Sequence, residues 1–265
     1  MENYIDKNRD AWNKRAELHI NSDFYDVKGF LEGKSSLNPI ELRLLGDISD
    51  KSILHLQCHF GQDTISLSRL GAEVTGVDLS DKAIALAKEL AKKDNSSAKF
   101  ICCDIYDLPN HLDETFDIVF TSYGTIGWLP DLDKWAKLIT RFLNPNGQFI
   151  FVEFHPFVWM FDDNLSEITY NYFKDKPIVE IKDASYTDGK LPGKLEDVSW
   201  NHALSEVINT LIFNGLKINS LDEFDYSPYD IFADSVEDEP GKFRVKKFDN
   251  KLPLVYSISA TKSDR

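Results

Sequence analysis

Two aspartates stand where a nucleoside-binding protein would need them. Asp78 ends a predicted strand and lies about twenty residues after the loop that follows an earlier strand, a position from which a carboxylate can accept both hydroxyls of a ribose. Asp104 follows the next predicted strand and can accept a hydrogen bond from an adenine amino group. The alternatives are a helix N-terminal charge for Asp78 and an Asx turn for Asp104.

The elements that position these side chains are strands and helices in alternation. Apolar runs predict strands over residues 52–56, 73–78, 99–103, 116–121 and 148–154. Apolar spacing predicts helices over 62–70, from Ser80 onwards and from about Asp131, while residues 144–147 read as a turn. Such alternation implies right-handed crossovers and a parallel sheet with helices on both faces.

Ligands bind outside the carboxyl ends of the strands in such a sheet. The residues that follow each predicted strand should therefore converge at one edge. They include the loop from Gln57 to Asp63, then Asp78, then Asp104 with Ile105, then Ser122 to Gly124, and finally His155.

The remaining segments flank this core. Residues 4–20 have a loose helical spacing, residues 201–213 predict a helix, and 216–224 and 254–261 predict two more strands. Regularity lapses over 157–199, which reads as an insertion of about 40 residues; a loop this long in a compact domain is usually functional or disordered. Its aromatic content argues against disorder, so we expect a lid over the site or, alternatively, a dimer contact.

Charge and composition narrow the function classes. The formal net charge is −14, which disfavours a nucleic-acid substrate. No apolar run reaches the ~18–20 residues of a membrane span, and the polar first residues do not resemble a signal peptide. The three cysteines form no CxxC and indicate a reducing compartment, so we expect a cytoplasmic protein.

The motifs taken in order resemble those of class I S-adenosylmethionine-dependent methyltransferases. Residues 53–80, ILHLQCHFGQDTISLSRLGAEVTGVDLS, are similar to the first motif and the acidic strand after it. Residues 103–109, CDIYDLP, are similar to the adenine-contacting loop, and residues 116–132 and 143–156 to the fourth- and fifth-strand motifs. The resemblance implies a Rossmann-like, seven-stranded, mostly parallel sheet with an antiparallel last strand and an insertion after the fifth strand.

The first loop departs from the family pattern of acidic-x-Gly-x-Gly-x-Gly. His55 replaces the acidic residue, Gln57 and His59 replace two glycines, and only Gly61 remains. Glycines matter most where backbone approaches a pyrophosphate, and S-adenosylmethionine has no phosphate. The same departure argues against a nicotinamide dehydrogenase.

A zinc site at His55, Cys58 and His59 is also disfavoured. Along a strand the two histidines would lie ~13 Å apart, too far for ligands of one ion. Only a sharp turn at residue 57 would bring them together. We therefore expect no metal.

The resemblance implies a set of site residues. The expected cofactor-binding residues are Gln57, His59, Gly61, Gln62, Asp63, Asp78, Leu79, Asp104, Ile105 and Ser122, with Trp12 capping the site. We expect His155 and Tyr123 to act in catalysis and Trp128, Trp200 and His202 to contact the acceptor; core packing is the alternative for these side chains.

The sequence thus predicts a methyltransferase acting on a small molecule, as a monomer or homodimer. A non-catalytic cofactor-binding scaffold or regulatory protein on the same fold is the alternative. We expect one domain over residues 1–265, with a helical cap over 1–47, a cofactor-binding half over 48–156, the insertion over 157–199 and a C-terminal helix with strands over 200–265.

Overall fold

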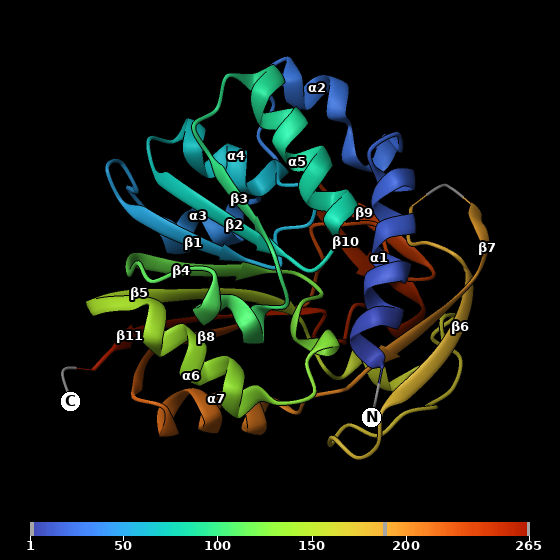
Figure 1. The fold of residues 1–265 in the computed structure, drawn as a ribbon. Helices are drawn as coiled ribbons and strands as arrows, with labels where there is room; N and C mark the ends of the chain where they lie inside the picture. The colour runs from blue at the N-terminus through green and yellow to red at the C-terminus, as the bar shows by residue number, and fades with distance from the viewer. Residues whose placement is uncertain (1–2, 188–189, 264–265) are drawn as a thin grey trace.

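The computed structural model describes residues 3–187 and 190–263. Its central element is a seven-stranded sheet in the order β3-β2-β1-β4-β5-β11-β8 (Figure 1). The strands are β1 (Ser52–Leu56), β2 (Glu73–Asp78), β3 (Lys99–Cys102), β4 (Phe116–Ser122), β5 (Leu143–Phe154), β8 (Leu216–Phe224) and β11 (Val255–Lys262). β11 runs antiparallel to both of its neighbours, which confirms the predicted sheet with its antiparallel last strand.

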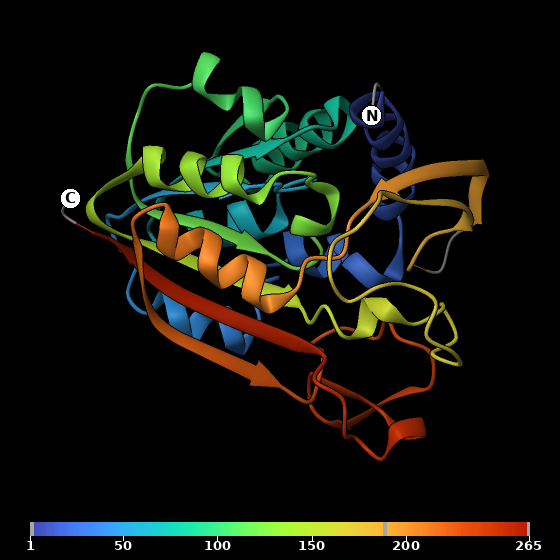
Figure 2. The same ribbon diagram turned by 90° about the horizontal axis from the view of Figure 1, so that it is seen from below.

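Helices cover both faces of the sheet because its strands alternate buried apolar side chains. On one face, Leu54 and Val119 pack with α6 (Leu132–Phe142) and α7 (Leu204–Phe213), which lie side by side in Figure 2. On the other face, Ile53 and Ile118 pack with α3 (Pro39–Leu45) and α4 (Gln62–Arg69). α5 (Asp81–Asp94) packs its alanine-rich side against Phe100 of β3.

Polar side chains set where two of these helices begin. Ser80 Oγ accepts the Ala83 N–H at 3.0 Å and caps α5, as the sequence predicted. Asp131 Oδ1 accepts the Lys134 N–H at 3.1 Å and caps α6. Both caps follow loops at the carboxyl edge of the sheet, so they also fix the loops that carry the site.

An N-terminal helical segment and a hairpin stand over that edge. The segment comprises α1 (Tyr4–His19), η1 (Asp23–Tyr25) and α2 (Val27–Leu31), and the hairpin pairs β6 (Ile178–Ala184) with β7 (Lys190–Ser199). The Asn8 amide bonds both backbone groups of Val198, at 2.8 and 3.0 Å. α1 and β7 therefore lie side by side, although Asn8 and Val198 are 190 residues apart in the chain (Figure 1).

Apart from shifts of one residue at strand ends, three differences from the sequence-based elements stand out. Residues 144–147, predicted as a turn, form an irregularity within β5, because Phe116 pairs with Leu143 and Ile118 with Gln148. α7 begins at Leu204, three residues later than predicted. A second hairpin of β9 (Ser235–Glu239) and β10 (Lys242–Val245) was not predicted, because both strands are short and rich in charged residues.

Short 3-10 turns complete the connections. They are η2 (Ile105–Asn110), η3 (Ile126–Trp128), η4 (Val158–Met160) and η5 (Lys246–Phe248). Within the described ranges, no helix combines the length and the apolar character that crossing a membrane requires.

Candidate functional site

A cavity of about 930 Å³ opens at the carboxyl edge of the sheet, between the strand loops, α1 and the β6–β7 hairpin. This volume suits small-molecule ligands. All but one of the residues expected at the site line it: Trp12, Gln57, His59, Gly61, Gln62, Asp63, Asp78, Leu79, Asp104, Ile105, Ser122, Tyr123, Trp128, Trp200 and His202. The exception is His155.

The loop after β1 turns sharply although it contains only one glycine, Gly61. Gln57, His59 and Gly61 all have positive φ, at 55°, 51° and 80°. Two of the three are residues that rarely adopt this conformation, at a cost of about 1–2 kcal/mol each. At Gly61 a side chain is also excluded by space, because an added Cβ would lie 2.6 Å from Phe100. The substitutions at 57 and 59 thus change the side chains in the cavity and keep the turn.

Asp78 is held at the end of β2 by backbone donors. One carboxylate oxygen accepts the His59 N–H and the other the Ser80 N–H, both at 2.8 Å. Burial raises the pKa of Asp78 to about 6. Each carboxylate oxygen has a further lone pair, so Asp78 can still accept hydroxyl groups from a ligand in the cavity. Asp104 is arranged similarly: its Oδ1 accepts the Tyr106 N–H at 3.0 Å.

Two buried polar atoms in the β1 loop have no hydrogen-bond partner among the described residues, Gln57 Oε1 and His59 Nδ1. The Gln57 amide nitrogen, in contrast, donates to the Thr125 carbonyl at 2.9 Å. Buried polar atoms normally have partners. These two therefore suit a polar ligand group in this part of the cavity, and the Gln57 oxygen suits a donor such as an ammonium.

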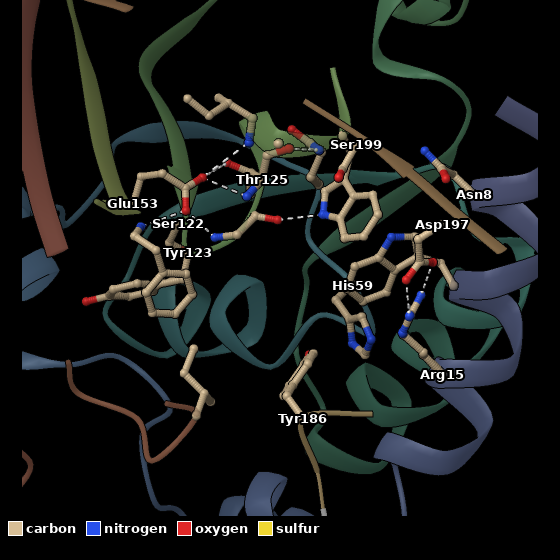
Figure 3. A pocket seen from close by; sticks show the side chains of 18 of the residues that line it. Asn8, Arg15, His59, Ser122, Tyr123, Thr125, Glu153, Tyr186, Asp197 and Ser199 are labelled. Carbon is tan, nitrogen blue, oxygen red and sulfur yellow. Dashed lines mark hydrogen bonds and ion pairs between the residues drawn. The ribbon is translucent and has the colours of Figure 1, made fainter. Parts of the chain in front are cut away.

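Glu153 fixes the loop after β4. Its carboxylate accepts backbone N–H groups from Gly124, Thr125 and Ile126, the last two at 2.7 and 3.2 Å (Figure 3). Trp128 then donates its ring N–H to the Gly124 carbonyl at 2.7 Å. Glu153 was not predicted from the sequence, although a lone acidic residue in an apolar strand is a usable signal of a buried hydrogen-bonded carboxylate.

Tyr123, on the cavity wall, is hydrogen-bonded to another buried carboxyl group, that of Glu41. Its hydroxyl donates to Glu41 Oε2 at 2.9 Å, while Glu41 Oε1 accepts the Asn38 N–H at 2.8 Å. Burial, and then the negative charge of Asp63, raise the pKa of Glu41 to about 7. Glu41 was not predicted, because it lies on α3 in the segment read only as a helical cap.

A histidine pair connects three separate parts of the wall. His19 Nδ1 of α1 lies 3.2 Å from His59 Nε2, and His19 Nε2 lies 2.7 Å from Ser185 Oγ beside the hairpin tip. Burial lowers the pKa of His19 to about 3 and that of His59 well below its ordinary value. Both imidazoles are therefore neutral near pH 7.

His155 lies outside the cavity lining, so the structure does not support its expected catalytic role. Its Nε2 lies 2.9 Å from Glu223 Oε1 of β8, and its Nδ1 accepts the Phe157 N–H at 3.1 Å. The neighbours Phe154 and Pro156 reach the cavity instead. His155 directly follows β5, as predicted. Its side chain points away from the cavity, toward Glu223 of β8.

His202 and Trp200 line the wall, and both ring nitrogens of His202 already have partners. The two ring nitrogens of His202 lie 2.8 Å from the Leu129 carbonyl and 3.1 Å from Glu206 Oε2. The Trp200 ring packs edge-on against Tyr4 at 5.3 Å between centroids. These residues shape the cavity. Residues 3–187 and 190–263 contain no group of three or more His, Cys, Asp or Glu side chains that could hold a metal ion.

Comparisons with known proteins agree with this geometry. Residues 54–151 match the family model of a methyltransferase domain. The chain is 25% identical over 221 residues to a ubiquinone biosynthesis O-methyltransferase of Idiomarina loihiensis, covering 77% of this chain and 84% of that protein. It is 27% identical over 132 residues to a protein of the same name from Coxiella burnetii, covering 49% of this chain and 56% of that protein.

Solved structures share the fold. The chain is similar to a putative S-adenosylmethionine-dependent methyltransferase from Listeria monocytogenes, with a TM-score of 0.58 and 23% identity over 84% of this chain and 95% of that one.

Proposed function

The chain belongs to the class I S-adenosylmethionine-dependent methyltransferases, and we propose that its acceptor is a small molecule held in the cavity beside the cofactor. The observation that carries this proposal is the cavity itself. At about 930 Å³, it is lined by the cofactor-loop residues and covered by α1 and the hairpin. The names of the relatives from ubiquinone biosynthesis support a small acceptor, and the net charge of −14 argues against nucleic acid.

The residues fit the cofactor in three places. Asp78 would accept the ribose hydroxyls, and Asp104 with Ile105 would contact the adenine. Gln57 Oε1, buried without a partner in the described structure, would accept from the ammonium of the methionine part. Gly61, Gln62, Asp63, Leu79, Ser122, His59 and Trp12 would complete the contact surface.

The bound cofactor supplies an electrophilic methyl group on a sulfonium. The chain's own part is to hold the nucleophile of the acceptor in line, roughly 3–3.5 Å from that methyl group. Tyr123 and Trp128 lie on the wall past β4 and would orient the acceptor. Glu153 maintains this wall by holding the backbone of the loop.

We also propose that the insertion acts as a lid within one domain. Its hairpin brings Ser185 and Tyr186 to the cavity wall, and Ser185 Oγ lies 2.7 Å from His19 Nε2 of α1. Excluding water from this space strengthens the electrostatic interactions inside it. A cytoplasmic location and a monomeric or dimeric state are part of the same proposal.

A transfer assay on fractionated metabolites tests the proposal. The protein is incubated with methyl-labelled S-adenosylmethionine and a cell extract that ultrafiltration has divided into metabolites and macromolecules. We expect label in the metabolite fraction, and clearly less of it with an Asp78→Ala variant at the same cofactor concentration. Label confined to protein or nucleic acid, or no label in either fraction, would contradict a small-molecule acceptor.

A further inference from the structure

Aromatic rings from four separate segments meet around one end of the cavity. The rings of Tyr123 and Tyr229 pack at 5.1 Å between centroids, and Tyr229 packs on Phe24 at 5.7 Å. Phe24 in turn packs on Tyr186 at 5.5 Å, and the hydroxyls of Tyr186 and Tyr25 lie 2.6 Å apart. All five side chains line the cavity, and we call them the aromatic cage.

Asp63 lies at this cage without a counter-ion. It lines the cavity from the first turn of α4, and the hydroxyl of Ser122 donates to it at 3.3 Å. Burial, and then the negative charge of Asp63, raise the pKa of Tyr229, which places the carboxylate close to the cage. No Lys or Arg of the described ranges forms an ion pair with it.

The cations of the cavity wall are already neutralised. Three Lys or Arg side chains line the cavity in the part of the chain that the structure describes. Arg15 pairs with Asp197, Lys34 with Asp26, and Lys182 with both Asp163 and Glu180. A ligand anion would therefore meet no free positive charge and would lie near uncompensated carboxylates.

Aromatic faces with a nearby carboxylate attract cations. A cation within about 6 Å of a ring centroid interacts with the ring quadrupole, and the interaction strengthens when the site is shielded from water. We propose that the aromatic cage and Asp63 bind an ammonium group of the acceptor, so that the acceptor is an organic amine cation. This inference rests on the proposed function, because it assigns the chemical class of the same acceptor.

A matched set of three probes tests the cage. Choline, its uncharged isostere 3,3-dimethylbutan-1-ol and the anion 3,3-dimethylbutyrate have bulky ends of nearly the same shape and differ in net charge. Choline's charge is on the bulky end itself, whereas the butyrate's is on the carboxylate at the opposite end. Each is titrated calorimetrically into protein saturated with S-adenosylhomocysteine, so that the cofactor part of the cavity is filled. We expect choline to bind at least about tenfold more tightly than the alcohol, since 1.4 kcal/mol of cation–π and charge interaction gives this ratio.

Single substitutions test which residues cause the preference for choline over the alcohol. Asp63→Asn and Phe24→Leu should each reduce the choline-to-alcohol ratio about three- to tenfold. Asp163→Asn is the matched control, because this carboxylate also lines the cavity but is paired with Lys182 at 2.7 Å; it should leave the ratio unchanged. The melting temperature and the affinity for S-adenosylhomocysteine are measured for each variant, so that misfolding or a lost cofactor contact is recognised.

Three results would overturn the inference. They are equal binding of choline and the alcohol, tighter binding of the butyrate, and no measurable choline binding up to about 100 mM, which is far weaker than the roughly millimolar range of a weak specific site. The labelled products of the transfer assay give an independent check by ion exchange. A cationic product supports the cage, whereas a neutral or anionic product contradicts it and leaves small-molecule methylation intact. A protein that labels no small molecule at all contradicts the proposed function instead.

Discussion

Arg15 of α1 and Asp197 of β7 form a two-pronged ion pair, with nitrogen–oxygen distances of 2.8 and 2.5 Å. Both side chains are buried, at 6% and 7% exposure. The pair joins the first helix to the far strand of the insertion at the cavity wall (Figure 3). The β6–β7 hairpin is therefore attached to the N-terminal segment as well as to the sheet.

Removing one partner of this pair should destabilise the protein strongly. Asp197→Ala leaves the Arg15 guanidinium buried and unpaired, and we expect a loss of about 3–5 kcal/mol in the free energy of unfolding. Lys7→Ala is the control, since Lys7 and Glu196 join the same two elements with side chains that are both 41% exposed. This change should cost less than about 1 kcal/mol in chemical denaturation. Equal effects of the two changes would show that the buried pair contributes no more to stability than the exposed pair.

Asp78 should matter for the cofactor more than for the fold. Asp78→Ala removes charge-assisted hydrogen bonds worth ~1.5–3 kcal/mol each, so the dissociation constant for S-adenosylhomocysteine should rise at least about tenfold. Asp81→Ala is the comparison, because this exposed carboxylate begins α5 and contacts Asn13 at 2.7 Å. An Asp78 variant that binds as tightly as the Asp81 variant would refute the ribose contact.

Glu41 should make stability fall as the pH rises. Its pKa of about 7 in the folded protein lies above the ordinary 4.5, so the folded state retains a proton that the unfolded chain releases. This contribution to the free energy of unfolding is fully present below pH 4.5 and is lost as the pH rises through 7. Its size is about 1.4 kcal/mol for each unit by which the pKa is raised.

Glu41→Gln should flatten this part of the pH–stability curve. Urea denaturation at several pH values between 4.5 and 8 measures it, with exposed Glu32→Gln as the control that retains the wild-type slope. A slope unaffected by Glu41→Gln would mean that the carboxyl group titrates normally.

The hairpin tip can be removed without disturbing its base. Lys182 and Leu195 are paired across β6 and β7, so residues 183–194 can be replaced by an Asn-Gly turn. Asp197 and Val198 keep their contacts with α1, while Ser185 and Tyr186 leave the cavity. We expect methyl transfer to the acceptor to fall at least about a hundredfold, with cofactor affinity nearly unchanged, because a misplaced acceptor reacts slowly. Normal turnover with an altered oligomeric state in size-exclusion chromatography would identify the segment as a dimer contact.

The sequence predicted the core well because local patterns encode it. β1, β2 and β8 match their predicted ranges residue for residue, since apolar runs and capping residues such as Ser80 mark them. The rule that ligands bind at the carboxyl ends of parallel strands (the strand-end rule) also predicted that Asp78 and Asp104 lie at one edge, and both line the same cavity.

The acceptor side was less predictable, because chain-distant segments build it. Phe24, Tyr186 and Tyr229 meet although no sequence pattern connects them. Glu41 is revealed only by its contact with Tyr123. His155 shows the limit of the strand-end rule, which predicts the edge on which a residue lies but not the direction of its side chain once a strand has ended.

The most direct test of the cofactor site is a calorimetric titration of the wild-type protein with S-adenosylhomocysteine. We expect one site per chain with a dissociation constant in the micromolar range, roughly −8 kcal/mol. S-adenosylmethionine should bind comparably, and NADH should not bind, because the β1 loop has one glycine where a pyrophosphate would need three. The assignment would be contradicted if NADH bound and neither S-adenosylhomocysteine nor S-adenosylmethionine gave a binding signal.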